Sequence, residues 1–362
     1  MRAATATIDL AALRHNLAVA RARSSGAKVV AVVKANGYGH GAARLLPALA
    51  DADMLGVACI EEALALREAG AVQPLLLLEG PFEPDELPLC ERLGFEIVVH
   101  EPGQLAMLES ARLERPLTVW LKVDSGMNRL GFRPEAALAA LARLRNCAAV
   151  APSIRLMTHF ASADEPSNPA TRAQIGQFAR VATGLDLQRS FSNSAGVLAW
   201  PEAHAEWVRP GVMLYGVSPL AGHDGRVDGL RPVMTLTTRL IAVKEVRAGE
   251  AVGYAGTWTA PADRQIGIAA IGYGDGYPRH AGSGTPVLVD GAPATLAGRV
   301  SMDMVAVDLA GHPEARVGTP VTLWGEGLPV ETVAAHAGTI AYELLCGLTG
   351  RVHVRLLDRP PD

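Results

Sequence analysis

Short apolar runs alternate with helix-like segments along the chain up to about residue 215. The helix-like segments, such as residues 61–70 and 134–146, repeat apolar residues every three or four positions, which is the period of an amphipathic helix. This alternation predicts strands joined by crossover helices in a parallel sheet. The predicted strands are residues 28–34, 54–59, 74–79, 95–99, 117–123, 153–160, 190–193 and 212–216.

Eight strands with crossover helices match the size of a closed (β/α)₈ barrel of the TIM type. We therefore predict an α/β fold whose N-terminal domain, residues 8–225, is such a barrel. A doubly wound open sheet stays as the alternative, because a strand count does not prove closure. Before the first strand, Asp9 is expected to cap a helix whose Leu10, Leu13 and Leu17 share one face.

The pattern changes after Tyr215. Residues 233–246, 263–274, 284–291, 304–309 and 319–327 are strand-like segments separated by Gly and Pro turns, without helix-like segments between them. They predict a mainly β C-terminal domain over residues 226–362, with which residues 1–7 are candidates to pair. The Gly-, Asp- and Pro-rich stretch 221–232 is the expected linker.

Composition and charge narrow the class of ligand. The chain is 49% hydrophobic and 19% charged, with a formal net charge of -4, so bulk electrostatics favour neither nucleic acid nor an anionic membrane as a partner. The four cysteines form no CxxC or metal-ligand spacing, which argues against a disulfide framework and against a metal site. With no signal-like or membrane-spanning apolar run, a cytoplasmic protein acting on a small molecule is expected.

Polar residues recur where predicted barrel strands end, which is the end that carries the sites of TIM-type barrels. Lys34 closes the first strand, and desolvation there would lower its pKa and free its amine for Schiff-base chemistry. The alternative is a strand-terminal lysine that extends into solvent. The Gly-rich loop after Lys34 contains Tyr38, and Ser194 and Gly211 follow the last two strands, where barrels often bind phosphate. Lys122, Arg129, His159 and Arg209 share the same predicted end.

Eight segments, taken in order, resemble the alanine racemases that depend on pyridoxal 5'-phosphate (PLP). No single segment is specific, but the ordered set spans nearly the whole chain. The segments are AVVKANGYGHG around Lys34, LKVDSGMNRLG around Arg129, MTHFASAD around His159, SNSAG around Ser194, RPGVMLYG around Arg209, VGYAGTW around Tyr254, IGYGDGYPR around Tyr273 and GRVSMDM around Met302.

The resemblance implies a two-base racemase. Lys34 would bind PLP as a Schiff base and act as acid/base on one face of Cα, and Tyr254 of the other subunit would act on the opposite face. His159 and Arg209 would connect to Tyr254 by hydrogen bonds, and Arg209 would face the pyridine nitrogen. A homodimer with shared active sites follows from this implication.

The resemblance also implies the ligand contacts. Tyr38, Ser194, Gly211 and Val212 would hold the phosphate. The substrate would meet Arg129 together with Met302, Tyr273 and Asp303, and Lys122 would be carbamylated. Gly350 stands where a C-terminal tyrosine of one family pattern is expected, so that tyrosine is predicted to be missing.

The implied activity is interconversion of L- and D-alanine. The alternatives are a racemase of broader amino-acid specificity, a PLP-dependent decarboxylase of basic amino acids with the same architecture, and a PLP-binding protein without enzymatic activity. The paired bases Lys34 and Tyr254 argue against the decarboxylase, and the β-rich second domain argues against the non-enzymatic protein.

Overall fold

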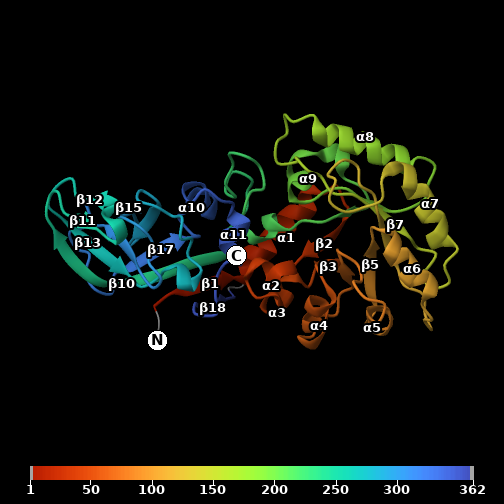
Figure 1. The fold of residues 1–362 in the computed structure, drawn as a ribbon, viewed down its shortest axis with the longest axis horizontal. Coiled ribbons are helices and arrows are strands. Elements are labelled where there is room, and N and C mark those ends of the chain that lie inside the picture. Colours follow the sequence, from red (N-terminus) through yellow and green to blue (C-terminus); the bar gives the residue numbers. More distant parts are fainter. Residues whose placement is uncertain (1–2, 359–362) are drawn as a thin grey trace.

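The computed structural model describes residues 3–358 and shows two lobes side by side along the long axis (Figure 1). One lobe is a barrel wrapped by helices, and the other contains a mainly antiparallel sheet, in whose described strands only β1 (Thr5–Asp9) and β18 (His353–Leu357) pair in parallel. Within the described residues, no helix is long and apolar enough to cross a membrane. The two lobes together determine where the candidate site lies.

The first lobe is a closed eight-stranded barrel, which confirms the predicted fold and excludes the open sheet. Neighbouring strands are parallel, and the last strand pairs with the first through Lys28–Trp207 and Val29–Val208. The strands are β2 (Lys28–Val32), β3 (Met54–Val57), β4 (Leu75–Leu77), β5 (Phe95–Val99), β6 (Val119–Lys122), β7 (Arg155–Met157), β8 (Arg189–Ser190) and β9 (Trp207–Val208).

The predicted eighth strand was wrong. Residues Val212–Tyr215 form a 3₁₀ helix, η3, and the eighth strand is the two-residue β9 before it. All four residues of η3 are buried, so this apolar run has no alternation that would separate a strand from a buried helical turn. The real strand was missed because Glu206 and Arg209 flank only two apolar residues.

Helices cover the outside of the barrel (Figure 1). The Asp9 carboxylate accepts from the Ala11 and Ala12 amides at 2.8 and 3.0 Å, which confirms the predicted cap, and Leu10, Leu13 and Leu17 are buried. The helices of this lobe are α1 (Leu10–Arg23), α2 (Lys34–Tyr38), α3 (Ala42–Leu45), α4 (Ile60–Glu68), α5 (Glu86–Leu93), α6 (Pro102–Ser110), α7 (Pro134–Arg145), α8 (Ala170–Ala182) and α9 (Ser194–Ala199).

The interior of the barrel is a packed core of its own. Side chains alternate between inside and outside along each strand, and one buried cluster takes a residue from most strands of the barrel. Its members are Val30, Met54, Leu76, Val98, Trp120, Met157 and Trp207. Arg155 and Glu96 form an ion pair beside Trp120, toward the N-terminal ends of the strands, while Lys122 and Arg209 lie toward the C-terminal ends.

The second lobe is an eight-stranded sheet in the order β13-β16-β15-β14-β17-β10-β1-β18. The long strand β10 pairs with β1, β17 and also β13, so that the strands from β10 round to β13 close into a ring. The sheet consists of β1 (Thr5–Asp9), β10 (Met234–Val246), β13 (Arg264–Ala269), β14 (Pro286–Val289), β15 (Ala292–Leu296), β16 (Val305–Asp308), β17 (Pro320–Trp324) and β18 (His353–Leu357).

Thr5–Asp9 thus belongs to the sheet of the second lobe, whereas the exact division of the chain at residues 225 and 226 stays a prediction. The second lobe also contains elements that the sequence pattern did not predict. They are the short pair β11 (Ala251–Val252) and β12 (Trp258–Thr259), strands β15 and β18, and the helices α10 (Val330–His336) and α11 (Ala341–Cys346).

Candidate active site

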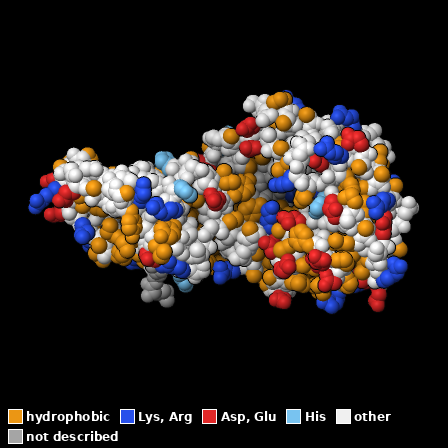
Figure 2. All heavy atoms as spheres, in the orientation of Figure 1, with side chains coloured by type: hydrophobic (Ala, Val, Ile, Leu, Met, Phe, Trp, Pro, Cys, Tyr) orange, Lys and Arg blue, Asp and Glu red, His pale blue; other side chains and the backbone are white. Residues whose placement is uncertain are grey.

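A cavity of about 1130 Å³ lies at the C-terminal ends of the barrel strands. Figure 2 shows the surface hollowed where the two lobes meet, with hydrophobic side chains and several Lys or Arg side chains around the hollow. The structure brings together there the predicted site residues of the barrel, namely Lys34, Tyr38, Lys122, Arg129, His159, Ser194, Arg209, Gly211 and Val212.

Lys34 is the first residue of α2, which is a left-handed turn rather than the end of a strand. Ala35, Asn36 and Gly37 have φ values of 52°, 53° and 65°, and Tyr38 has a φ of 52°. L-residues adopt this conformation at a cost of ~1–2 kcal/mol each, so the surroundings must hold it. Glu62 accepts from the Ala35 amide at 2.7 Å, and the Asn36 side chain accepts from the Ala42 amide at 3.0 Å. The turn places Lys34 and Tyr38 in the same cavity wall.

Arg209 is buried among neutral acceptors. Its guanidinium donates to the Ser190 carbonyl at 3.0 Å, to the Ser190 hydroxyl at 2.5 Å and to the Thr158 carbonyl at 2.6 Å. It also lies 3.5 Å from Nδ1 of His159. Burial lowers the pKa of Arg209 to about 10, so the guanidinium keeps its charge at neutral pH and cannot serve as a ready proton donor.

Lys122 and His159 titrate well below their ordinary ranges. Burial, reinforced by nearby Arg209 and Arg129, lowers the pKa of Lys122 to about 8. Burial and the same cations, with Arg209 first, hold the pKa of His159 well below its usual value, so the imidazole is neutral at pH 7. Positive charge is therefore already crowded at this end of the barrel.

No carboxylate within the described residues forms an ion pair with Lys34, Lys122, Arg129 or Arg209, although ion pairs stabilise many other arginines of the chain. A buried cation without a counter-charge is unfavourable unless a ligand supplies it. The cavity is thus suited to an anion.

The backbone after β9 forms a cradle beside this charge. The Ser194 hydroxyl accepts from the Gly211 amide at 2.8 Å and from the Met213 amide at 3.3 Å. A Cβ on Gly211 would lie 2.5 Å from the Tyr38 hydroxyl, so only glycine leaves room there. The Tyr38 and Ser194 hydroxyls and the backbone at the start of this helical turn form a polar wall that suits a phosphate group. Asn193, which precedes Ser194, caps α9 by accepting from the Gly196 amide at 3.0 Å.

The remaining predicted site residues lie on the second lobe and do not line this cavity. Tyr254 begins the 3₁₀ turn η4 (Tyr254–Gly256), and Tyr273 begins η5 (Tyr273–Asp275). Their side chains are 67% and 40% exposed, and that of Met302 is 53% exposed. Asp303 lies next to Met302 and contacts Arg351. A single chain thus leaves these groups on its surface.

The expectation that Gly350 replaces a C-terminal tyrosine was wrong. Tyr342, at the start of α11, lines the cavity with its ring centroid 6.0 Å from that of Tyr38, and Gly350 is not a lining residue. Burial raises the pKa of Tyr342 to about 12, so it is a neutral hydrogen-bond donor. Cys346 also lines the cavity and was missed. No sequence signal placed α11 here, because the helix is short and reaches the barrel only through the tertiary fold.

Comparison with known proteins identifies the family. The model for the N-terminal domain of alanine racemase matches residues 8–219, and the model for its C-terminal domain matches residues 233–356. The chain belongs to the alanine racemase family. It is similar to the alanine racemase of Vibrio cholerae, with 53% identity over 98% of both chains.

Other alanine racemases are similarly close. The biosynthetic alanine racemase of Escherichia coli is 51% identical over 99% of this chain and 100% of its own length. The crystal structure of the biosynthetic alanine racemase from Pseudomonas aeruginosa is 50% identical and superposes with a TM-score of 0.96 over 99% of this chain and 100% of that chain. The barrel and the β domain therefore have the arrangement of a solved alanine racemase.

Proposed function

We propose that the protein interconverts L- and D-alanine with PLP as its cofactor. The observation that carries the proposal is the cavity in which Lys34 shares the wall with buried, unpaired cations and a hydroxyl and amide cradle. Membership of a PLP-dependent family supports it.

The residues of the cavity fit PLP. Lys34 is the amine that would hold its carbonyl carbon, and Tyr38, Ser194, Gly211 and Val212 would hold its phosphate. Tyr342 adds a further phenol next to Tyr38. Arg209 would face the pyridine nitrogen, and because a guanidinium does not readily release a proton, it would leave that nitrogen unprotonated. When bound, PLP withdraws electrons from Cα of the amino acid and so makes its proton acidic.

Racemisation needs a proton to leave one face of Cα and another to arrive at the opposite face. Lys34 serves one face in this proposal, and Tyr254 serves the other. Tyrosine is a weak acid with an ordinary pKa of about 10, so Tyr254 needs a polar neighbour that stabilises its phenolate. His159, backed by Arg209 at 3.5 Å from Nδ1, is that neighbour.

Tyr254 can take this role only if a second copy of the chain supplies it. In one chain it is 67% exposed on the second lobe and does not line the cavity that contains Lys34. A homodimer in which each second lobe covers the partner's cavity would complete two sites, bringing Tyr273, Met302 and Asp303 to the substrate beside Arg129. The exposure of these side chains in the single chain is consistent with such an assembly.

Lys122 is the proposed site of carbamylation. Its pKa of about 8 leaves an appreciable fraction as free amine at neutral pH, which is the form that reacts with carbon dioxide. A carbamate would replace a buried positive charge by a negative one between Arg209 and Arg129, whose charges contribute to the low pKa. Extra electron density beyond Nζ would verify it, and a bare amine in crystals grown with bicarbonate would disprove it.

The experiment that tests the function follows Cα hydrogen exchange. The PLP-loaded protein is incubated in D₂O with a panel of amino acids, and both deuterium at Cα and the change of optical rotation are measured. We expect both with alanine and neither with ornithine, lysine or arginine. Release of carbon dioxide from a basic amino acid would favour the decarboxylase instead, and PLP binding without exchange would favour a carrier.

Lys28 and Lys34 provide a matched pair of variants. Lys28 begins the barrel strand β2 and Lys34 lies two residues after its end, and the Lys28 ammonium stacks over the Trp207 ring at 5.2 Å. Lys34→Ala is expected to abolish exchange with alanine, whereas Lys28→Ala is expected to retain it. Exchange retained by Lys34→Ala would contradict the assignment of Lys34.

A further inference from the structure

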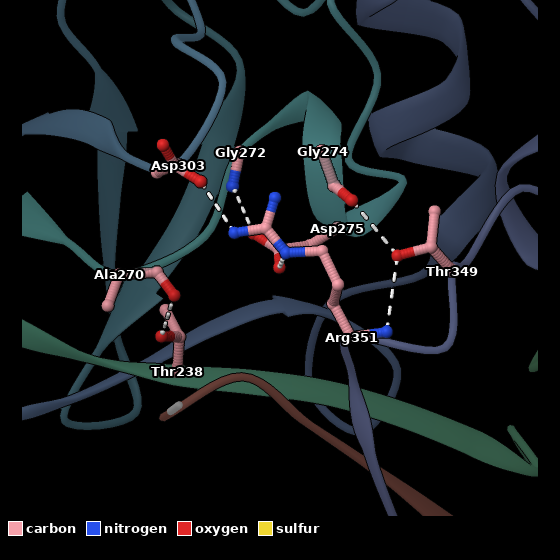
Figure 3. Close-up of polar contacts among 8 residues, drawn as sticks. All are labelled: Thr238, Ala270, Gly272, Gly274, Asp275, Asp303, Thr349 and Arg351. Carbon is pink, nitrogen blue, oxygen red and sulfur yellow. Dashed lines mark hydrogen bonds and ion pairs between the residues drawn. The ribbon is translucent and has the colours of Figure 1, made fainter. Parts of the chain in front are cut away.

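Three segments that are distant in the sequence meet on the second lobe around one arginine. Figure 3 shows the Arg351 guanidinium between Asp275, which ends the turn η5, and Asp303, which follows Met302. We propose that Arg351 is a positioning residue for racemisation, holding Tyr273 and Met302 in the arrangement in which they meet the partner's cavity. The inference rests on the proposed function, in which these two residues complete the partner's site.

The Arg351 side chain ties two carboxylates together. Its Nη2 donates to Oδ1 of Asp303 at 2.5 Å, and its Nε lies 3.3 Å from Oδ1 of Asp275 (Figure 3). The Asp275 side chain is fully buried, and its Oδ2 accepts from the Gly272 amide at 2.9 Å. A buried carboxylate needs such partners, so the guanidinium and the amide together fix where the turn lies.

Backbone hydrogen bonds join the same segments. The Tyr273 amide donates to the Ser301 carbonyl at 3.0 Å, and the Gly274 amide donates to the Met302 carbonyl at 2.8 Å. The Thr349 hydroxyl donates to the Gly274 carbonyl at 3.0 Å, which ties the turn to the segment that carries Arg351 (Figure 3). These hydrogen bonds therefore tie Tyr273 and Met302 to the segment around residue 349.

Close packing leaves this unit little freedom. A Cβ on Gly272 would lie 2.2 Å from the Ser301 carbonyl oxygen, and one on Gly274 would lie 2.2 Å from Nη1 of Arg351. The backbone approach requires glycine at residue 272, whereas at residue 274 the Arg351 side chain would have to shift. Tyr273 and Met302 are nevertheless exposed, at 40% and 53%. A binding site needs its side chains held by such supporting contacts, and this unit supplies them to Tyr273 and Met302.

Variants of Arg351 separate positioning from folding. Arg351→Met keeps an apolar stem but removes both carboxylate contacts, and Arg351→Lys keeps a charge that can reach one of them. Arg264→Met is the matched control, because Arg264 pairs with Asp308 in the same sheet but does not contact the turn. We expect Arg351→Met to raise KM for alanine about tenfold with kcat changed less than about threefold. Arg351→Lys should restore part of the loss, and Arg264→Met should leave both constants unchanged.

A second readout does not depend on turnover. Amide hydrogen exchange in residues 272–276 and 301–304 is expected to become faster in Arg351→Met and to stay unchanged in Arg264→Met. PLP affinity should stay the same in both, because neither Arg351 nor Arg264 lines the cavity that would bind PLP. Unchanged exchange rates together with an unchanged KM in Arg351→Met would overturn the inference.

Mixed dimers test whether Arg351 acts on the partner's site. Arg351→Met chains are mixed with an excess of Lys34→Ala chains, so that each functional barrel is completed by an unaltered second lobe. Such dimers should show the wild-type KM, with one active site per dimer. A KM that stays raised would mean that Arg351 acts within its own chain, and would overturn the inference. If Arg351→Met does not fold, Arg351→Lys enters the same mixture with the same two outcomes.

A parallel mixture of Lys34→Ala with Tyr254→Phe chains separates this inference from the proposed function. If that mixture regains activity, the sites are shared and the Arg351 result stands by itself. If it stays inactive, the shared site fails, whatever the Arg351 variants show.

Discussion

The two ends of the barrel each carry an arginine in the interior, but only one of the two arginines forms an ion pair with a carboxylate of the described residues. At the N-terminal end, Arg155 pairs with Glu96 and lies 5.1 Å from the ring centroids of both Trp120 and Trp207. Trp120 also donates to Glu96 at 2.6 Å. At the C-terminal end, Arg209 donates only to carbonyls, a hydroxyl and an imidazole nitrogen in the described residues.

The difference supports the proposal that the C-terminal end of the barrel binds the ligand. Arg155 has its counter-charge within the chain, so its end of the barrel is complete and contributes to stability. Arg209 forms no ion pair with a carboxylate of the described residues, and an anion in the cavity would supply its counter-charge. In TIM-type barrels the C-terminal end generally carries the site, and here the charge balance gives the physical reason.

Replacing Arg209 is expected to have the largest effect on activity. Arg209→Gln removes the buried cation but keeps a donor for the surrounding carbonyls. We expect kcat/KM for alanine to fall about 100-fold, while the free energy of unfolding of the protein without PLP changes by less than about 1 kcal/mol. Steady-state kinetics and urea unfolding provide both values. A large loss of stability would mean that Arg209 supports the fold as Arg155 does.

Replacing Arg155 should give the opposite result. Arg155→Met leaves the Glu96 carboxylate, 15% exposed, without its cation. The free energy of unfolding should fall by about 3 kcal/mol, with kcat/KM changed less than about twofold. Arg143→Met is the control, since the Arg143–Glu109 pair is exposed and its loss should leave the free energy of unfolding nearly unchanged. Activity lost in the folded Arg155→Met protein would show that the two ends are not independent.

The pH dependence of stability tests the cost of a second buried cation, Lys122, at the same end of the barrel as Arg209. Its folded pKa of about 8 is below its ordinary value of 10.5, so the unfolded chain binds more protons between these two pH values. Lys122 therefore destabilises the fold fully below pH 8, and this cost is relieved as the pH rises toward 10.5. Lys122→Met should be more stable than the wild type by about 2 kcal/mol at pH 7 in carbon dioxide-free buffer, and the difference should shrink by pH 9.5.

Urea unfolding at the two pH values measures this difference. Adding bicarbonate at pH 7 should stabilise the wild type but not Lys122→Met, because only the lysine can form a carbamate. A difference between the two proteins that does not change with pH would contradict the low pKa of Lys122.

Local sequence signals predicted the barrel and the residues that follow its strands. Lys34, Lys122 and His159 could be placed because each comes directly after, or ends, an apolar run, and parallel strands bring such positions to one end. The helix cap at Asp9 could be predicted for a similar reason, because it depends only on neighbouring residues. The left-handed turn after Lys34 was not predictable, because Ala35 and Asn36 have no sequence feature that requires a positive φ.

Features that depend on contacts between distant segments were missed, because no local sequence pattern encodes them. The strand β9 is only two residues long, and the closure of the barrel rather than any local pattern makes it a strand. Tyr342 was missed because α11 is six residues long and comes from the other domain. The contact of Arg351 with Asp275 and Asp303 joins residues 48 or more positions apart, and nothing in the sequence pairs them.

The most direct test of the account is the mixture of Lys34→Ala with Tyr254→Phe chains. Each protein alone should be almost inactive toward alanine, because each dimer lacks one of the two proposed bases at both sites. After the chains are mixed under conditions that exchange subunits, a mixed dimer contains one site with both Lys34 and Tyr254, and racemisation should return. Dimers that exchange subunits but stay inactive would contradict a site built from two copies of the chain.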